Sequence, residues 1–270
     1  MLKFVYGTDF HGNVKKYSDV LLFAIDHKIP IVHIGADLLP KNSNMLVEQK
    51  NFVTGFLKNY YKKANTMGIK VIGGFGNDDL FIRKKYFRKY ATLLDEVPYL
   101  LDGYEFTAYN FVDDYPFSLK TATKLDFEGW TCPDPYLGPP CDFNEQGYYK
   151  IPDIQEYFRQ KGTIEDDLKL IKPTNKTIMA MHMPPAGVGL DVCYGGRRVG
   201  SKAIYDWIKR ETSLRLLLCG HIHENFAVTK TWKAQIGSTM VIQPGQGTSH
   251  THAVYIEIDD QKINTSFLEI

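Results

Sequence analysis

Short apolar runs alternate along the first part of the chain with longer segments of helical periodicity. The runs expected to form strands are 3–6, 29–34 and 69–72. Apolar residues at three- and four-residue spacing predict helices at 14–27 and 45–67, and Gly68 would end the second helix. Strands alternating with helices of this length are typical of βαβ units. We therefore predict an α/β fold built on a largely parallel sheet.

The same pattern continues beyond residue 80. We predict helices at 80–103, 163–171 and 202–210, with Thr163 and Ser201 as N-caps of the last two. Further strands are expected at 104–112, 176–181 and 214–219. Three last β-like runs are 239–243, 253–258 and 263–268. We expect these three to be antiparallel strands that give a second sheet packed on the first.

Residues 118–163 differ from the rest in composition. The stretch from Cys132 to Cys141 holds four prolines, which exclude a regular helix or a central strand. Loops of this length are usually functional lids or disordered, and the surrounding aromatic residues favour a packed lid. We predict one domain over 1–270 with this insertion. Cys132 and Cys141 share the loop, but reduced thiols in a cytoplasmic protein are the favoured interpretation.

Polar side chains that suit metal ions follow five of the predicted strands. These residues are Asp9, His11, Asp37, Asn77, His182, His221 and His223. In open α/β sheets, ligands gather outside the carboxyl ends of the strands, so we expect these side chains to meet. The set lacks a thiolate, which argues against a structural zinc site. Mixed oxygen and imidazole ligands suit Mn, which we expect, with Fe, Ni or Zn as alternatives. Seven ligands suffice for two ions if one carboxylate bridges them.

Two divalent ions would suit chemistry at phosphorus. Ions about 4 Å apart clamp the attacking and leaving oxygens of an in-line displacement, and they make hydroxide available at neutral pH. With two carboxylates and a bridging hydroxide, roughly one positive charge remains, which complements a phosphodiester anion. The sequence therefore predicts attack of a metal-bridging hydroxide on a phosphodiester, with a phosphomonoester as the less favoured substrate.

The order of these motifs resembles that of the calcineurin-like metallophosphoesterases. The matching blocks are Asp9-x-His11, Gly35-Ala36-Asp37, Gly76-Asn77-Asp78-Asp79, His182, Gly220-His221-Ile222-His223 and Ile242-Gln243-Pro244-Gly245. The resemblance runs from residue 3 to about residue 258 and is greatest to the small single-domain bacterial and archaeal members. It implies an α/β fold in which a two-sheet sandwich is flanked by helices, in four layers α/β/β/α.

The resemblance also implies a distribution of the metal ligands. One ion would take Asp9, His11 and His223, and Asp37 would bridge the two ions. The other ion would take Asn77, His182 and His221.

One position departs from the family. Where the family usually has a histidine that protonates the leaving group or steadies the phosphoryl charge, this chain has Asp78. Asp78 would serve as an acid only if desolvation or a neighbouring carboxylate raised its pKa. Alternatively, His250 or His252 replaces it, or catalysis is confined to good leaving groups. We take Asp78, the adjacent Asp79 and His252 as candidate catalytic residues.

The glycine-rich loop after His182 carries Arg197 and Arg198. Either could bind a phosphate with two hydrogen bonds, although solvated loop arginines are more common. The expected substrate is a small-molecule phosphoester, with nucleotide-like compounds among the candidates.

Composition narrows the function classes. The formal net charge of +1 gives no electrostatic case for nucleic acid or for an anionic membrane, and it disfavours a repair nuclease. The apolar start is too short for a signal peptide, and no run is long enough to span a membrane. We expect a cytoplasmic hydrolase. The alternative is a non-catalytic scaffold with the same fold; a protein phosphatase is less favoured because that branch keeps the histidine that Asp78 replaces.

Overall fold

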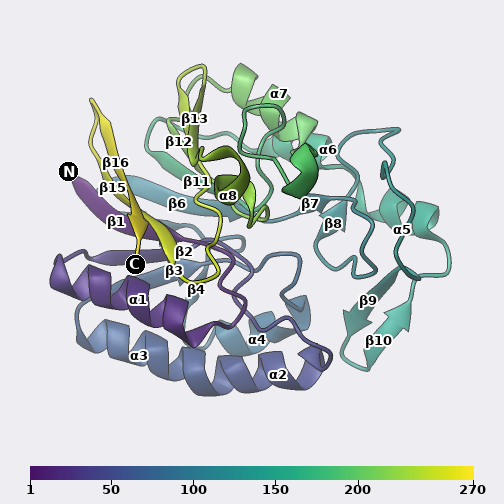
Figure 1. Ribbon diagram of the computed structural model, residues 1–270, viewed down its shortest axis with the longest axis horizontal. Coiled ribbons are helices and arrows are strands. Elements are labelled where there is room, and N and C mark those ends of the chain that lie inside the picture. Colours follow the sequence, from purple (N-terminus) through teal and green to yellow (C-terminus); the bar gives the residue numbers. More distant parts are fainter.

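Two six-stranded sheets lie face to face in the computed structural model, which describes residues 1–270 (Figure 1). The strand order is β16-β15-β1-β2-β3-β4 in the first sheet and β13-β14-β12-β11-β6-β5 in the second. Helices cover the outer face of each sheet (Figure 1). The predicted four-layer α/β/β/α sandwich is confirmed.

The first sheet and its helices use both ends of the chain. Its strands are β1 (Leu2–Gly7), β2 (Ile31–Ile34), β3 (Lys70–Gly73), β4 (Thr92–Leu93), β15 (His252–Ile258) and β16 (Ile263–Glu269). Strands β1 to β4 are parallel, whereas β15 pairs antiparallel with β1, with Val5 opposite Tyr255. Its helices are α1 (Val14–Asp26), α2 (Met45–Phe52) and α3 (Lys58–Thr66), and a π-helical turn over Val53–Leu57 joins the last two.

The second sheet is built from the middle of the chain. Its strands are β5 (Tyr99–Leu101), β6 (Tyr104–Tyr109), β11 (Thr177–Met181), β12 (Leu216–Leu218), β13 (Lys233–Ile236) and β14 (Thr239–Ile242). Helices α6 (Ile164–Leu170) and α7 (Lys202–Arg210) pack on its outer face, and the short α8 (Asn225–Thr229) follows β12. The predicted caps are confirmed, since the hydroxyls of Thr163 and Ser201 accept the backbone N–H of Asp166 and Ile204 at 3.0 Å.

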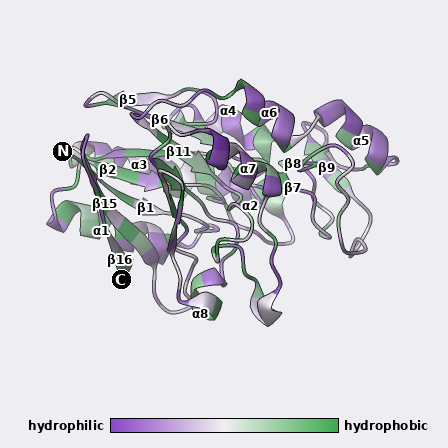
Figure 2. Cartoon of the chain, turned by 90° about the horizontal axis from the view of Figure 1, so that it is seen from above, coloured by the Kyte–Doolittle hydropathy of each residue, from purple (hydrophilic) through white to green (hydrophobic).

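Three apolar layers hold the sandwich together. Val20 of α1 packs in the layer between the helices and the first sheet, and Trp207 of α7 packs in the layer outside the second sheet. Between the sheets, the rings of Phe4 and Phe106 meet edge to face at 5.3 Å. The central parallel strands are buried on both faces, which is why they are continuously apolar in sequence. Figure 2 shows hydrophobic residues along these strands and hydrophilic ones on α5 and α6.

The predicted helix over 80–103 is wrong. This stretch holds a 3₁₀ turn at Phe81–Arg83 and the four-residue α4 (Lys84–Phe87), and then forms β4 and β5. The chain must cross from the first sheet to the second within these residues. Its basic residues do not share one helix face, because Arg83 is buried whereas Arg88 and Lys89 are exposed beyond the end of α4.

The expectation for the last three strands also needs correction. β14 is parallel to β12 and lies in the second sheet, whereas β15 and β16 are antiparallel and extend the first sheet. The reason lies in the connection after β12, where α8 and β13 carry the chain back across the sheet so that β14 enters in the same direction. Neither α8 nor β13 was predicted.

Residues 112–163 project from one end of the sandwich (Figure 1). They form β7 (Val112–Asp113), β8 (Thr123–Lys124), β9 (Cys141–Asn144), β10 (Gly147–Lys150) and α5 (Ile154–Lys161). The fully buried Lys120 anchors the segment, with its ammonium 2.7 Å from Asp114 and over the rings of Tyr115 and Tyr136. All four cysteines are free thiols. None of the helices combines the length and the apolar character needed to cross a bilayer.

Candidate metal centre

The loops at the carboxyl ends of five strands meet at one edge of the sandwich. They follow β1, β2 and β3 in the first sheet and β11 and β12 in the second. They carry the seven predicted ligands, which are Asp9, His11, Asp37, Asn77, His182, His221 and His223. The structure brings all seven together, in two groups.

The first group contains Asp9, His11 and His223. The Nε2 atoms of the two histidines lie 3.0 Å apart, and Oδ1 of Asp9 lies 3.4 Å from Nε2 of His223. Oδ2 of Asp37 lies 3.7 Å from Nε2 of His11. One ligand atom from each of these four residues falls within 4.8 Å of all the others, as in a site for one metal ion.

The second group is centred on Asn77. Its Oδ1 lies 2.9 Å from Nε2 of His182 and 2.9 Å from Nδ1 of His221. Oδ2 of Asp37 is 3.3 Å from Nε2 of His182, so Asp37 contacts both groups. This is the place that a bridging carboxylate would occupy.

The donor set fits divalent cations. Along the contact between His11 and His223, only one of the two nitrogens can carry a proton, whereas a cation would accept both lone pairs. The Asp9 and Asp37 carboxylates are 1% exposed, and two buried negative charges this close call for positive charge between them. Carboxylate, amide and imidazole donors without a thiolate suit Mn, Fe, Ni or Zn. Metal identity and ligand roles stay predictions.

The backbone at the site is strained. Four of the seven non-glycine residues with positive φ are candidate ligands: Asp9 (58°), His11 (45°), Asp37 (51°) and His221 (70°). Such conformations persist only where the surroundings impose them, and they cluster at functional sites. Here the backbone N–H groups of Asp9 and His11 bond to the carbonyls of Ala36 and Asp37, and that of His221 bonds to the Asp9 carboxylate at 3.0 Å.

Two glycines leave room for the carboxylates. A Cβ at Gly76 would lie 2.1 Å from Oδ1 of Asp37, and one at Gly220 would lie 2.6 Å from Oδ2 of Asp9. Any larger residue at either position would displace a candidate ligand.

The buried carboxylates and imidazoles of the site shift one another's pKa values. Burial alone would lower the pKa of His182, but the carboxylates of Asp37 and Asp9 outweigh burial and raise it to about 9. Burial likewise would raise the pKa of Asp9, but His223 and His182 lower it to about 2. For His221, burial and the neighbouring His182 lower the pKa to about 3. The carboxylates thus stay ionised and favour positive charge in their midst.

The candidate catalytic residues differ in placement. Asp78 lies against the centre, with its backbone N–H donating to Oδ1 of Asp37 at 2.9 Å; burial and that carboxylate raise its pKa. The Asp79 carboxylate is instead buried in the loops, where it accepts the backbone N–H groups of Leu38, Leu39 and Gly76.

The structure does not bring His252 into either group. Its ring packs against Phe226 and Phe267, and its Nε2 lies 3.4 Å from Glu269. His250 lies on the exposed loop before β15.

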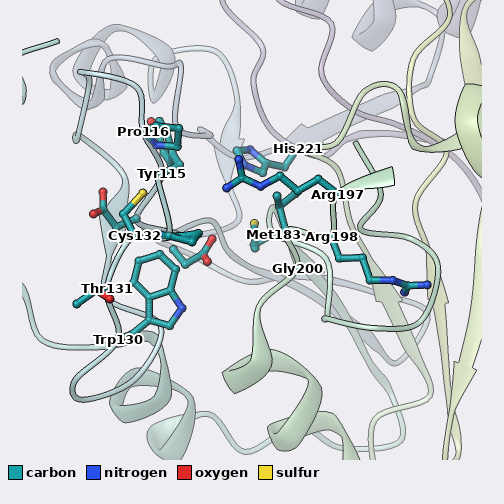
Figure 3. Close-up of a pocket in the computed structure, with 14 residues that line it drawn as sticks. Tyr115, Pro116, Trp130, Thr131, Cys132, Met183, Arg197, Arg198, Gly200 and His221 are labelled. Atoms are coloured by element: carbon teal, nitrogen blue, oxygen red, sulfur yellow. The ribbon is translucent and has the colours of Figure 1, made fainter. Parts of the chain in front are cut away.

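A pocket of about 240 Å³ lies beside the second group, with His221 in its wall (Figure 3). Tyr115, Trp130 and Met183 supply much of its apolar lining. Both predicted arginines line it, but they point in different directions. The Arg197 guanidinium extends across the pocket towards His221 and is paired with Asp134, whereas Arg198 turns away, 3.6 Å from Asp191 (Figure 3).

Two residues of the site were not predicted. Lys41, in the loop between β2 and α2, holds its ammonium 2.8 Å from Oδ2 of Asp78. The hydroxyl of Tyr115 lies 3.5 Å from Nδ2 of Asn77. Neither belongs to a motif, so no sequence signal singles them out.

Solved structures share this fold at low sequence identity. A dimetal phosphatase from Danio rerio is 9% identical, with a TM-score of 0.57 over 99% of this chain and 96% of its own. The protein TT1561 of Thermus thermophilus is 12% identical, with a TM-score of 0.54 over 98% of both chains. Another crystal structure reaches 0.60 at 14% identity, again over 98% of both. No protein-family model and no curated protein sequence matches the chain.

Proposed function

We propose that this protein is a metal-dependent phosphoesterase of the calcineurin-like class, with a dinuclear centre. The observation that carries the proposal is the convergence of seven metal-type donors from both sheets in two groups that share Asp37. The likeness of the fold to a dimetal phosphatase supports it. When bound, a pair of divalent ions would polarise the phosphoryl oxygens and lower the pKa of a bound water.

The candidate ligands would be divided between the two ions. Asp9, His11 and His223 would hold one ion, Asn77, His182 and His221 the other, and Asp37 would bridge them. The backbone bonds to the Asp9 and Asp37 carboxylates keep these ligands in place before any ion binds, which reduces the cost of ordering them.

The proposed substrate is a small phosphodiester rather than a phosphomonoester. With two divalent ions, two buried carboxylates and a bridging hydroxide, roughly one positive charge would remain, which complements the single charge of a diester better than the two charges of a monoester. The pocket beside His221 would take one organic group of the diester. Its aromatic and thioether lining, with Arg197 across it, suits a planar, nucleotide-like group. We propose one domain over 1–270, in which the segment 118–163 forms a wall of this pocket.

The test is hydrolysis of a chromogenic phosphodiester and its matching monoester after reconstitution with Mn, Ni or Zn, with metal content measured on the same samples. Asp37→Asn should abolish turnover and reduce bound metal. Asp260→Asn is the matched control. Asp260 is an exposed carboxylate paired with Lys176, which precedes β11, whereas the candidate ligand His182 follows the other end of that strand. Two ions bound without turnover on any phosphoester would favour the scaffold alternative, and no bound metal would refute the proposal.

A further inference from the structure

The loop between β2 and α2 places a cation at the edge of the candidate centre. Lys41 lies four residues after Asp37, and its Nζ lies 2.8 Å from Oδ2 of Asp78. Its side chain is 55% exposed, whereas that of Asp78 is 9% exposed. The ammonium therefore stands between solvent and the centre.

Two contacts connect this ammonium to the candidate ligands. Asp78 donates its backbone N–H to Oδ1 of Asp37, and the preceding residue, Asn77, holds its Oδ1 2.9 Å from two histidines. An anion drawn to the centre from this side would meet the Asp78 carboxylate, and an ionised carboxylate would repel it. The ammonium of Lys41 cancels that local charge and is the more exposed of the two groups.

The two pocket arginines and Lys120 have carboxylate partners of their own. Arg197 is paired with Asp134 across the pocket, and Arg198 turns towards Asp191. Lys120 is fully buried against Asp114. Lys41 has Asp78 as its one charged partner and lies 5.8 Å from the ring of Phe117. An ammonium has three donors, so it can keep one carboxylate and still offer a bond to an incoming anion.

We propose that Lys41 binds a non-bridging oxygen of the substrate's phosphoryl group, and that Asp78 holds the ammonium at the mouth of the centre for this purpose. The role rests on the proposed function, which supplies the phosphoryl group. Lys41, on the loop after β2, would thus supply the positive charge that Asp78, on the loop after β3, does not provide. Lys41 acts here as a fixed charge and hydrogen-bond donor, so the role requires no proton transfer.

The test compares inorganic phosphate binding, measured calorimetrically in the presence of Mn, with KM and kcat for the chromogenic phosphodiester. Lys41→Gln should weaken phosphate binding and raise KM by about 10- to 100-fold, the range expected for a lost hydrogen bond to a charged group. Lys41→Arg should retain most of both. Lys169→Gln is the matched control, because Lys169 is 57% exposed and contacts Asp166 at 2.7 Å. Bound metal should be the same in all variants.

The same substitution in an Asp78→Asn protein tests whether Lys41 binds the phosphoryl group directly or only neutralises Asp78. In Asp78→Asn, which keeps the shape and removes the charge, Lys41→Gln should still weaken phosphate binding, though less than in the wild type, because an amide holds the ammonium less firmly than a carboxylate. If that loss disappears, Lys41 only neutralises Asp78 and the proposal is wrong. Unchanged phosphate affinity in Lys41→Gln, or no phosphate binding by the wild type, would also overturn it. Failure of the proposed function appears separately, as absent metal-dependent turnover in the wild type.

Discussion

The Nε2 atoms of His11 and His223 lie 3.0 Å apart, although 212 positions separate the two residues in the chain. His11 follows β1 of the first sheet, and His223 follows β12 of the second. Their contact therefore joins the carboxyl ends of strands from the two different sheets. An ion bound between them would be a cross-link between the two halves of the sandwich.

Metal binding should therefore stabilise the fold. Mn at about 100 times its Kd should raise the free energy of unfolding by about 2.7 kcal/mol, because a ligand that binds only the native state stabilises it by mass action. Thermal unfolding with and without a chelator measures this. Asp37→Asn should lose most of the increase, whereas Asp260→Asn should keep it. Equal transitions with and without metal would contradict a site between the sheets.

Gly76→Ala should impair the centre. The added Cβ would lie 2.1 Å from Oδ1 of Asp37, so the carboxylate or its loop must move. We expect bound metal and turnover to fall at least about tenfold, as small misplacements at reacting centres cost far more than that. Gly55→Ala is the control, since its Cβ meets no atom within 4 Å inside a helical segment and should leave both unchanged.

Asp79→Ala should cost stability. The substitution leaves the buried N–H groups of Leu38, Leu39 and Gly76 without an acceptor, which should reduce the free energy of unfolding by about 3 kcal/mol or more. Urea unfolding measures the loss. In the control Asp259→Ala, the carboxylate removed also accepts two backbone N–H groups, but it lies in a partly exposed turn where water can replace it, so the loss should be much smaller. Lost turnover with unchanged stability would instead make Asp79 catalytic.

The two pocket arginines should behave differently. Arg197→Ala should raise KM for a phosphodiester with a planar organic group by about tenfold, because its guanidinium reaches across the pocket towards His221. Arg198→Ala should leave KM within about twofold, because Arg198 turns away. Steady-state kinetics gives KM for both variants. Equal increases in KM would contradict the different orientations of the two side chains.

His33 should make stability depend on pH. It lies buried between Tyr6 and Phe106 with no hydrogen-bond partner for either ring nitrogen, and burial lowers its pKa to about 3. Between pH 6.5 and pH 3 the unfolded chain binds a proton that the folded protein refuses, so stability falls as pH falls through this window. From about pH 7 to about pH 5, wild type should lose about 2 kcal/mol more than His33→Phe in urea unfolding. Parallel pH profiles would contradict this.

The sequence was sufficient to predict the elements that carry the centre. Apolar runs that stop at a glycine or a polar cluster mark strand ends, and parallel strands bring these ends to one edge, so Asp9, Asn77 and His221 could be placed together. Helix N-caps are equally local: the hydroxyls of Thr163 and Ser201 bond within their own first turns.

What could not be predicted depends on contacts distant in sequence. The runs that became β14 and β15 look alike as apolar patterns, yet they joined different sheets because α8 and β13 turned the chain between them. Residues 80–103 have helical periodicity, but the crossing between sheets replaced a helix by β4 and β5. Lys41 is an ordinary loop lysine until the fold brings Asp78 to it.

The pairing of β1 with β15 also has a consequence for synthesis. Val5 lies opposite Tyr255, so about 250 residues must be made before β1 gains this neighbour. At ribosomal rates of about 5–20 residues per second, one side of an apolar strand stays open for roughly 12–50 s. During that time β1 is an unpaired edge that can join another nascent chain. We therefore expect the yield of folded protein to depend on translation speed and on chaperones that shield this edge.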